Sequence, residues 1–311
     1  MEILLEFGLL ALGFLLLVKG ADWFVDGSAG IADRLGVPQI VIGLTIVAMG
    51  TSAPETAVSI TAALKGSADI TIGNVVGSNM LNILIILGVT SFIVPVAVAE
   101  STIRYELPWM LFVTAVLLVF GCTGNQVTFA EGIVFWILFL LYLGALFLSA
   151  MKNRQDMVQE EETKPFWKLG LFMAAGLGLV VWGSDVTVDA ATAIARMAGL
   201  SERFIGLTIV ALGTSLPELF TSVSAAIKGK ADIAIGNIVG SNIFNILFVV
   251  GTAALIIPVE FAPGFIIDTS AAIGAGVVLW LCAFRKRKLA RRDGILMLAC
   301  YAGYFLYLLQ G

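Results

Sequence analysis

The same segment of about 43 residues occurs twice in this chain, at 42–84 and again 163 positions later, at 205–247. About 30 of the roughly 43 aligned positions are identical, far more than a shared apolar composition produces. Each copy carries a proline and then a glutamate, Pro54-Glu55 and Pro217-Glu218, in a stretch otherwise apolar enough to lie in lipid. A duplicated apolar segment that is interrupted by proline predicts the central binding site of a secondary transporter.

The composition is typical of proteins that cross a membrane many times. Hydrophobic residues make up 59% and charged residues 13% of the chain, and the mean hydropathy is +1.01. The chain has no histidine, which excludes imidazole metal ligands and histidine-based acid–base chemistry. The scattered cysteines, Cys122, Cys282 and Cys300, are interpreted as small core residues. The acidic start, with Glu2 and Glu6, predicts a first membrane helix rather than a cleaved signal peptide.

A membrane-spanning helix needs about 20 mostly apolar residues, and ten stretches of the chain meet that need. They are 3–30, 39–64, 70–94, 106–122, 127–150, 166–196, 204–227, 233–257, 265–284 and 293–309. The longest polar stretch separates the fifth from the sixth. We therefore expect an N-terminal five-helix repeat at 1–150, a linker at 151–165 and a C-terminal five-helix repeat at 166–311.

Basic residues in the loops predict how the chain is oriented. Apart from Lys65, Arg196 and Arg203, they lie in loops that follow odd-numbered stretches, most densely at 285–292. Because basic loops stay in the cytoplasm, we expect both termini outside and the linker inside, in the plasma or inner membrane. Each half has an odd number of stretches, so the second copy enters the membrane from the opposite side. The predicted fold class is an all-α polytopic membrane protein with ten transmembrane helices in two inverted five-helix repeats.

Each proline is expected to interrupt its helix within the membrane. Proline removes a backbone donor and clashes with the carbonyl four residues earlier, which belongs to Gly50 or Gly213. Backbone carbonyls freed in lipid need a cavity, water or a bound cation, so carbonyls near the breaks are candidate cation ligands. These carbonyls and the adjacent hydroxyls belong to Ala48, Thr51, Ser52, Ala211, Thr214 and Ser215.

Glu55 and Glu218 place negative charge in the membrane interior, where a carboxylate needs a counter-charge. No lysine or arginine lies in the same proline-containing segments, so the expected counter-charge is a bound cation or a proton. The second part of each copy adds polar side chains: Asn74, Ser78, Asn79 and Asn82, and then Asn237, Ser241, Asn242 and Asn245. Oxygen ligands without sulfur or imidazole select hard cations such as calcium or sodium.

With GTSxPE followed by GSNxxN in both copies, the chain resembles the sodium/calcium exchanger family of the cation/calcium exchanger superfamily, in its prokaryotic form. The resemblance covers nearly the whole chain. It implies two inverted five-helix repeats with four ion sites at the centre, and an antiporter rather than an enzyme. It implies no cofactor and no nucleic-acid partner. The expected partners are the transported calcium and sodium ions and the lipid bilayer, and we expect the chain to act as a monomer.

The resemblance also implies a role for each motif residue. The calcium site would use Glu55, Glu218, Thr51 and Thr214. One sodium site would use the Ala48 carbonyl, Ser52, Ser78 and Glu55, and its symmetry mate the Ala211 carbonyl, Ser215, Ser241 and Glu218. The middle site would be lined by Asn82 and Asn245.

The charge of this site predicts a stoichiometry. Potassium-dependent members of the superfamily carry an aspartate where this chain has Asn245, so potassium dependence is not expected here. Only Glu55 and Glu218 then contribute fixed charge. One calcium ion neutralises the pair, whereas three sodium ions leave it at +1, which predicts electrogenic exchange of three sodium ions for one calcium ion by alternating access.

Three alternatives remain open from the sequence. The nearest is a proton-coupled or potassium-assisted calcium/cation antiporter. An intramembrane hydrolase could use Glu55 and Glu218 as an acid–base pair, although nothing in the sequence resembles a nucleophile or a water-activating metal site. A channel is the third, although a continuous pore does not need so costly a pair of carboxylates. Ion flux with and without a sodium gradient separates all of them.

Overall fold

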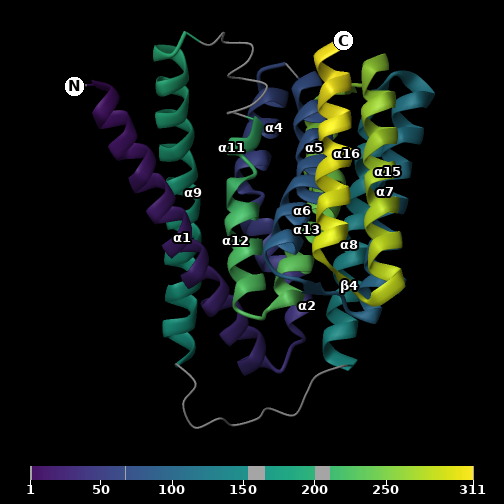
Figure 1. Cartoon of the computed structure of the whole chain (residues 1–311). Helices are drawn as coiled ribbons and strands as arrows, with labels where there is room; N and C mark the ends of the chain where they lie inside the picture. Colours follow the sequence, from purple (N-terminus) through teal and green to yellow (C-terminus); the bar gives the residue numbers. More distant parts are fainter. Residues whose placement is uncertain (1, 67, 153–164, 200–210, 311) are drawn as a thin grey trace.

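The described chain is built almost entirely of helices, as its apolar composition requires. A backbone in lipid must satisfy its hydrogen bonds within its own segment, which only a helix or a closed barrel achieves. The computed structural model describes residues 2–66, 68–152, 165–199 and 211–310. Helices α1 (Glu2–Leu35) and α9 (Phe166–Met197) cross each other on one side of the bundle, and the remaining helices stand beside them (Figure 1).

In the first half, the helices are interrupted where the repeated motifs occur. The predicted stretch 39–64 forms two arms that meet at 51°, just before Pro54. The stretch 70–94 changes to π-helical geometry from Leu81, the residue before Asn82. The elements after α1 are α2 (Gln39–Ile42), η1 (Gly43–Val47), α3 (Ala48–Thr51), α4 (Ala53–Leu64), α5 (Asp69–Met80), η2 (Leu81–Ile86), α6 (Leu87–Ile93), η3 (Thr102–Glu106), α7 (Leu107–Gly124) and α8 (Phe129–Lys152).

The second half repeats these interruptions. A π-helical segment begins at Asn245, the repeat mate of Asn82, and Pro217 again lies in the first turn of a helix. The elements after α9 are α11 (Ala211–Gly213), α12 (Leu216–Ile227), α13 (Ala231–Phe244), η5 (Asn245–Val250), α14 (Gly251–Ile256), α15 (Pro263–Lys286) and α16 (Arg291–Gln310). Two antiparallel ladders join the halves, β1 (Val96–Ala97) with β4 (Lys288–Leu289) and β2 (Gln126–Val127) with β3 (Val259–Glu260).

Seven of the described helices are long and apolar enough to cross a membrane, or up to eight if the bent pair at 39–64 counts as one span. The apolar stretches predicted from the sequence all overlap helices. The first helix runs five residues beyond its predicted end, to Leu35, and residues 204–210 of the seventh stretch lie outside the described residues. The described part of the chain thus has the mainly helical build of a membrane protein, and ten crossings remain a prediction.

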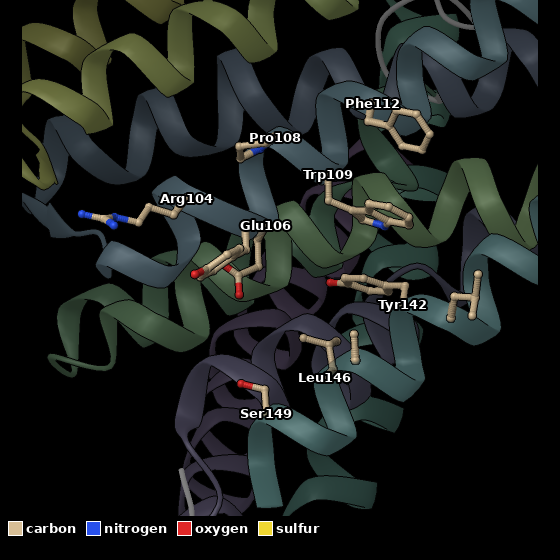
Figure 2. A pocket seen from close by; sticks show the side chains of 11 residues that line it. Arg104, Glu106, Pro108, Trp109, Phe112, Tyr142, Leu146 and Ser149 are labelled. Carbon is tan, nitrogen blue, oxygen red and sulfur yellow. The ribbon is translucent and has the colours of Figure 1, made fainter. Parts of the chain in front are cut away.

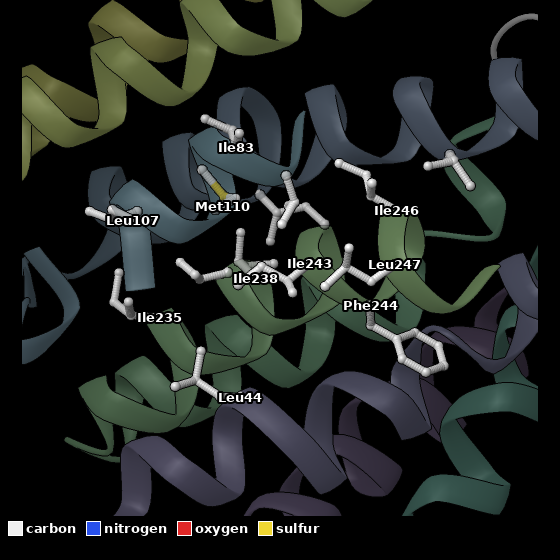
Figure 3. Packing of buried hydrophobic residues seen from close by; sticks show 14 of the residues in the cluster. Leu44, Ile83, Leu107, Met110, Ile235, Ile238, Ile243, Phe244, Ile246 and Leu247 are labelled. Atoms are coloured by element: carbon white, nitrogen blue, oxygen red, sulfur yellow. The ribbon is translucent and has the colours of Figure 1, made fainter. Parts of the chain in front are cut away.

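The centre of the bundle is formed by the two repeated segments. The most apolar part of Ala231–Ile256 is almost entirely buried inside the protein, whereas the most apolar parts of the outer helices are mostly not buried. Leu44 of η1 packs with Ile235 and Ile238 of α13 in the main hydrophobic cluster (Figure 3). The two backbones touch there, because a Cβ atom at Gly240 would lie only 2.6 Å from the carbonyl oxygen of Leu44.

This contact predicts an asymmetric effect of two equivalent substitutions. Gly240→Ala overpacks the α13–η1 contact and should lower the free energy of unfolding by about 1–3 kcal/mol, which a thermal melt in detergent detects. Gly77 occupies the same repeat position, and a Cβ there meets nothing within 4 Å among the described residues. Gly77→Ala is therefore the matched control and should leave the melting temperature unchanged or raise it, because alanine favours a helix. Equal losses in both variants would contradict the packing described here.

The two proline-containing segments run through the bundle in opposite directions. In Figure 1, α2 lies at the bottom and α4 at the top, whereas α11 lies above α12. In the same view α1 begins and α16 ends at the top, and α8 ends and α9 begins at the bottom. The proline-containing segments therefore approach the middle of the bundle from opposite ends.

Candidate functional site

The two glutamates of the repeated motif lie at equivalent places in the bundle. Glu55 is in the first turn of α4 and Glu218 is in the first turn of α12, and both are fully buried. The positive end of a helix dipole favours a carboxylate in its first turn. The proline that precedes each glutamate starts the helix at this depth, because proline is tolerated in a first turn and not in a helix interior.

Each glutamate is hydrogen-bonded by a serine from the other half of the chain. Ser52 Oγ donates to Glu218 Oε1 at 2.8 Å, and Ser215 Oγ donates to Glu55 Oε1 at 3.3 Å. The second element of each repeat supplies another serine: Ser78 Oγ lies 3.4 Å from Glu55 Oε1. The equivalent Ser241 Oγ lies 3.5 Å from Glu218 Oε1. The structure thus brings four predicted serines and both glutamates into one centre.

Four asparagines form hydrogen bonds between the two halves beside the glutamates. Asn79 and Asn242 each donate to the backbone carbonyl of the other, at 3.1 and 3.2 Å. Asn82 Nδ2 donates to Asn242 Oδ1 at 2.9 Å, and Asn245 Nδ2 donates to Asn79 Oδ1 at 3.1 Å. These bonds use the amide nitrogens of Asn82 and Asn245, so their amide oxygens point elsewhere. The orientation of each asparagine side-chain amide, oxygen against nitrogen, follows from this network of donors and acceptors.

Four oxygen atoms of this centre accept no hydrogen bond from any residue that the structure describes. Glu55 Oε2, Glu218 Oε2, Asn82 Oδ1 and Asn245 Oδ1 are buried, and none has a partner among the described residues. Buried polar atoms are nearly always paired, and a single unpaired oxygen costs about 1–3 kcal/mol. Two carboxylate and two amide oxygens, supplied equally by the two halves, are thus left unpaired, and oxygen atoms of these kinds are the ligands that hard cations prefer.

The remaining predicted ligands are placed less symmetrically. The Ala48 carbonyl already accepts from Ser52 N at 3.0 Å and from the hydroxyls of Thr51 and Ser241, each at 3.3 Å. Ala211 is the first residue of α11. Thr51 is fully buried and donates to Asn237 Oδ1 at 2.9 Å, whereas its repeat mate, Thr214, is partly exposed.

The same difference between the halves extends along both central helices. Gly236 is buried against η1 and Asn237 is buried beside it, whereas their repeat mates Gly73 and Asn74 are exposed and partly exposed. The centre is therefore closed on the side of η1 and α13 and more open on the side of α5.

Several residues that build the site have no individual role predicted from the motifs. Asn74 Nδ2 donates to the backbone oxygen of Glu55 at 3.1 Å, and Asn237 does the same for Glu218 at 3.4 Å. The sequence does contain a signal for these asparagines, because the GN and SN pairs recur in both copies of the repeat. Ser184 was not identified at all. Its hydroxyl donates at 2.7 Å to the Gly213 carbonyl, which the proline would otherwise leave free.

Comparison with known proteins gives the chain its relatives. The profile of the family described as sodium/calcium exchanger protein matches residues 5–148 and 168–310. The chain is 31% identical over 351 residues to the sodium/calcium exchanger MaX1 of Methanosarcina acetivorans, covering 98% of this chain and 99% of that one. It is 36% identical over 298 residues to the inner membrane protein YrbG of Escherichia coli, covering 91% and 90%.

The fold is also that of a solved exchanger. A structure of the sodium–calcium exchanger NCX_Mj, soaked with zero sodium and calcium, superposes with a TM-score of 0.86 at 34% identity, over 98% of this chain and 99% of that one. Both the family profile and these full-length relatives agree with the motifs found in the sequence. The chain belongs to the sodium/calcium exchanger family, and it is a cation/calcium antiporter of the prokaryotic type.

Proposed function

We propose that the chain exchanges sodium for calcium at the centre formed by Glu55, Glu218, Asn82 and Asn245. The observation that carries this proposal is the set of four buried oxygens without hydrogen-bond donors among the described residues. A bound cation removes the cost of leaving them unpaired. Oxygens of Thr51 and Thr214 complete the calcium site. The serine hydroxyls and the carbonyls of Ala48 and Ala211 complete the ligands of the flanking sodium sites.

The proposed stoichiometry is three sodium ions for one calcium ion. Glu55 and Glu218 are the carboxylates of the centre, so one calcium ion neutralises them and three sodium ions leave a charge of +1. Both cargoes need the same carboxylates, and they therefore compete. An empty site would cross the membrane with two unpaired carboxylates in low dielectric, which makes obligate exchange the favoured cycle. No cofactor enters this cycle.

The proposed architecture is ten membrane crossings in two inverted repeats, 1–150 and 166–311, joined by a linker at 151–165. It is supported by the opposite directions of the two proline-containing segments in Figure 1 and by site contacts that recur at a spacing of 163 residues. With basic loops inside, both termini lie outside the cell membrane and the linker lies in the cytoplasm. We propose that the monomer is the transporting unit.

Alternating access requires that the two halves adopt different conformations. An ion-paired cluster that forms in only one described half supports such a difference. Lys228 at the end of α12 donates to Asp26 Oδ1 and to the backbone oxygen of Asp22, both at 2.8 Å, which ties α12 to α1. The repeat mates are Lys65 with Asp185 and Asp189, and no equivalent ion pair forms between them in the described chain. Two halves of similar sequence thus differ in contacts as well as in exposure.

The experiment that tests the proposed function is calcium uptake into vesicles that contain the purified protein. An outward sodium gradient should drive calcium uptake, and equal sodium on both sides should abolish it. A proton gradient alone should drive none. Uptake driven by protons without sodium would instead establish the proton-coupled alternative, and calcium release in the absence of any counter-ion would indicate a channel.

A further inference from the structure

A cavity of about 690 Å³ lies on the outside of the bundle, between the start of α7 and the second half of α8. Its walls include Glu106, Trp109 and Phe112 from η3 and α7, and Tyr142 and Leu146 from α8 (Figure 2). None of these residues takes part in the hydrogen bonds of the candidate ion site. The cavity is therefore a second site, separate from the transport centre.

Three polar atoms in the walls of this cavity have no hydrogen-bond partner among the described residues. They are Glu106 Oε2, the indole nitrogen of Trp109 and the hydroxyl of Tyr142, and each is shielded from solvent. The Trp109 and Tyr142 rings lie nearly parallel, with centroids 6.3 Å apart. The cavity thus offers one carboxyl oxygen as an acceptor and two donors beside an aromatic wall. Because buried polar atoms are nearly always paired, we expect a bound molecule to supply the partners of these three atoms.

Apart from Arg104, Tyr105 and Ser149, the rest of the lining is apolar, and the cavity lies along helices that are long enough to span a membrane. Phe112 and Leu141 line it while exposing about half or more of their surfaces, at 47% and 61%. Arg104, at the edge, already forms an ion pair with Glu100 at 2.5 Å. An occupant therefore reaches the cavity from the hydrocarbon and must combine a polar head with apolar chains.

We propose that this cavity binds a phospholipid whose headgroup carries a primary ammonium, the phosphatidylethanolamine class. The ammonium donates to Glu106 Oε2 and lies against the aromatic wall, where a cation is attracted to the ring faces. Phosphate or ester oxygens of the same lipid accept from Trp109 and Tyr142. The acyl chains lie against Phe112 and Leu146.

The charges select this headgroup over the other common ones. A choline headgroup has no N–H to give to Glu106, and an anionic glycerol headgroup would bring its negative charge towards that carboxylate. Of these three headgroups, only ethanolamine combines an N–H donor for the carboxylate with phosphate oxygens for the two donors and no net negative charge. Hydrogen bonds that involve a charged group are about twice as strong as neutral ones, so Glu106 should dominate the selectivity.

Native mass spectrometry of the detergent-solubilised protein tests this site. The protein is mixed with equal amounts of dioleoyl phosphatidylethanolamine, phosphatidylcholine and phosphatidylglycerol, and the retained adducts are counted. The wild type should retain phosphatidylethanolamine about tenfold more than either competitor. Glu106→Gln should lower that preference to about twofold or less, because the amide keeps the shape and loses the charge. Glu260→Gln, an exposed carboxylate on β3, is the matched control and should retain the wild-type preference.

Three results would overturn the proposal. They are equal retention of the three lipids by the wild type, an unchanged preference in Glu106→Gln, and displacement of the adduct by millimolar water-soluble glycerophosphoethanolamine, which would show that no lipid chain is needed. Each variant is first checked for wild-type elution volume and melting temperature. If Glu106→Gln fails to fold, Tyr142→Phe replaces it, since it removes only the hydroxyl and should also reduce the preference measurably.

Discussion

Replacing either central glutamate by glutamine is expected to abolish sodium-driven calcium uptake, with a loss of at least about 100-fold for Glu55→Gln and for Glu218→Gln alike. Glutamine keeps the size of the side chain and removes one of the two charges that calcium needs. With calcium bound, the buried site would then carry an uncompensated positive charge. The initial rate of calcium uptake into sodium-loaded vesicles measures the effect.

The controls separate loss of transport from loss of folding. Removing one of two buried like charges should leave the melting temperature of the ion-free protein unchanged or higher, since the carboxylates repel each other when no cation lies between them. The exposed Glu260→Gln should transport at the wild-type rate. Near-normal uptake by either central variant would refute the proposed ligands, and a large difference between the two would refute their equivalence.

Converting a middle asparagine to aspartate should have the second-largest effect. Asn245 donates to Asn79 Oδ1 at 3.1 Å and leaves its own oxygen unpaired. Asn245→Asp removes the donor and adds a third negative charge, so the calcium-bound site would have to move across the membrane with a net charge of −1. Such a buried, uncompensated charge should slow sodium/calcium exchange at least about tenfold, measured as calcium uptake under a fixed sodium gradient.

Asn125→Asp provides the matched control for this charge change. Asn125 is exposed at the end of α7 in the left-handed conformation, with φ at 54°, which aspartate also tolerates. It should leave the uptake rate unchanged. Wild-type uptake by Asn245→Asp would show that the fixed charge of the centre does not control transport.

Much of the architecture could be predicted from the sequence because lipid restricts the choices. Apolar stretches of membrane length must be helical, and the helices begin and end within a few residues of most predicted limits. The meeting of the two proline-containing segments was also predictable, because inversion of the repeat brings them towards the middle from opposite sides. The partner of each serine was not predicted, because Ser52 was expected beside Glu55 and Ser215 beside Glu218, whereas each donates to the glutamate of the other half.

Other features depend on contacts between segments that no local pattern records. The π-helical segments at Leu81 and Asn245 shift the register of the central helices, and helix propensity does not encode them. The closure of one side depends on Gly240 touching Leu44, although Gly77 has the same sequence surroundings and no such contact among the described residues. Equivalent residues of two nearly identical segments thus have different neighbours, and the packing of the whole bundle decides which neighbours they have.

The most direct test of sodium-coupled calcium exchange is the membrane voltage at which calcium flux reverses in vesicles that contain the protein. With three sodium ions exchanged for one calcium ion, the reversal voltage should equal three times the sodium equilibrium potential minus twice that of calcium. It should shift with either gradient and stay fixed when the proton or potassium gradient changes. A flux that does not respond to voltage, or a reversal voltage that follows the proton gradient, would contradict the proposed exchange.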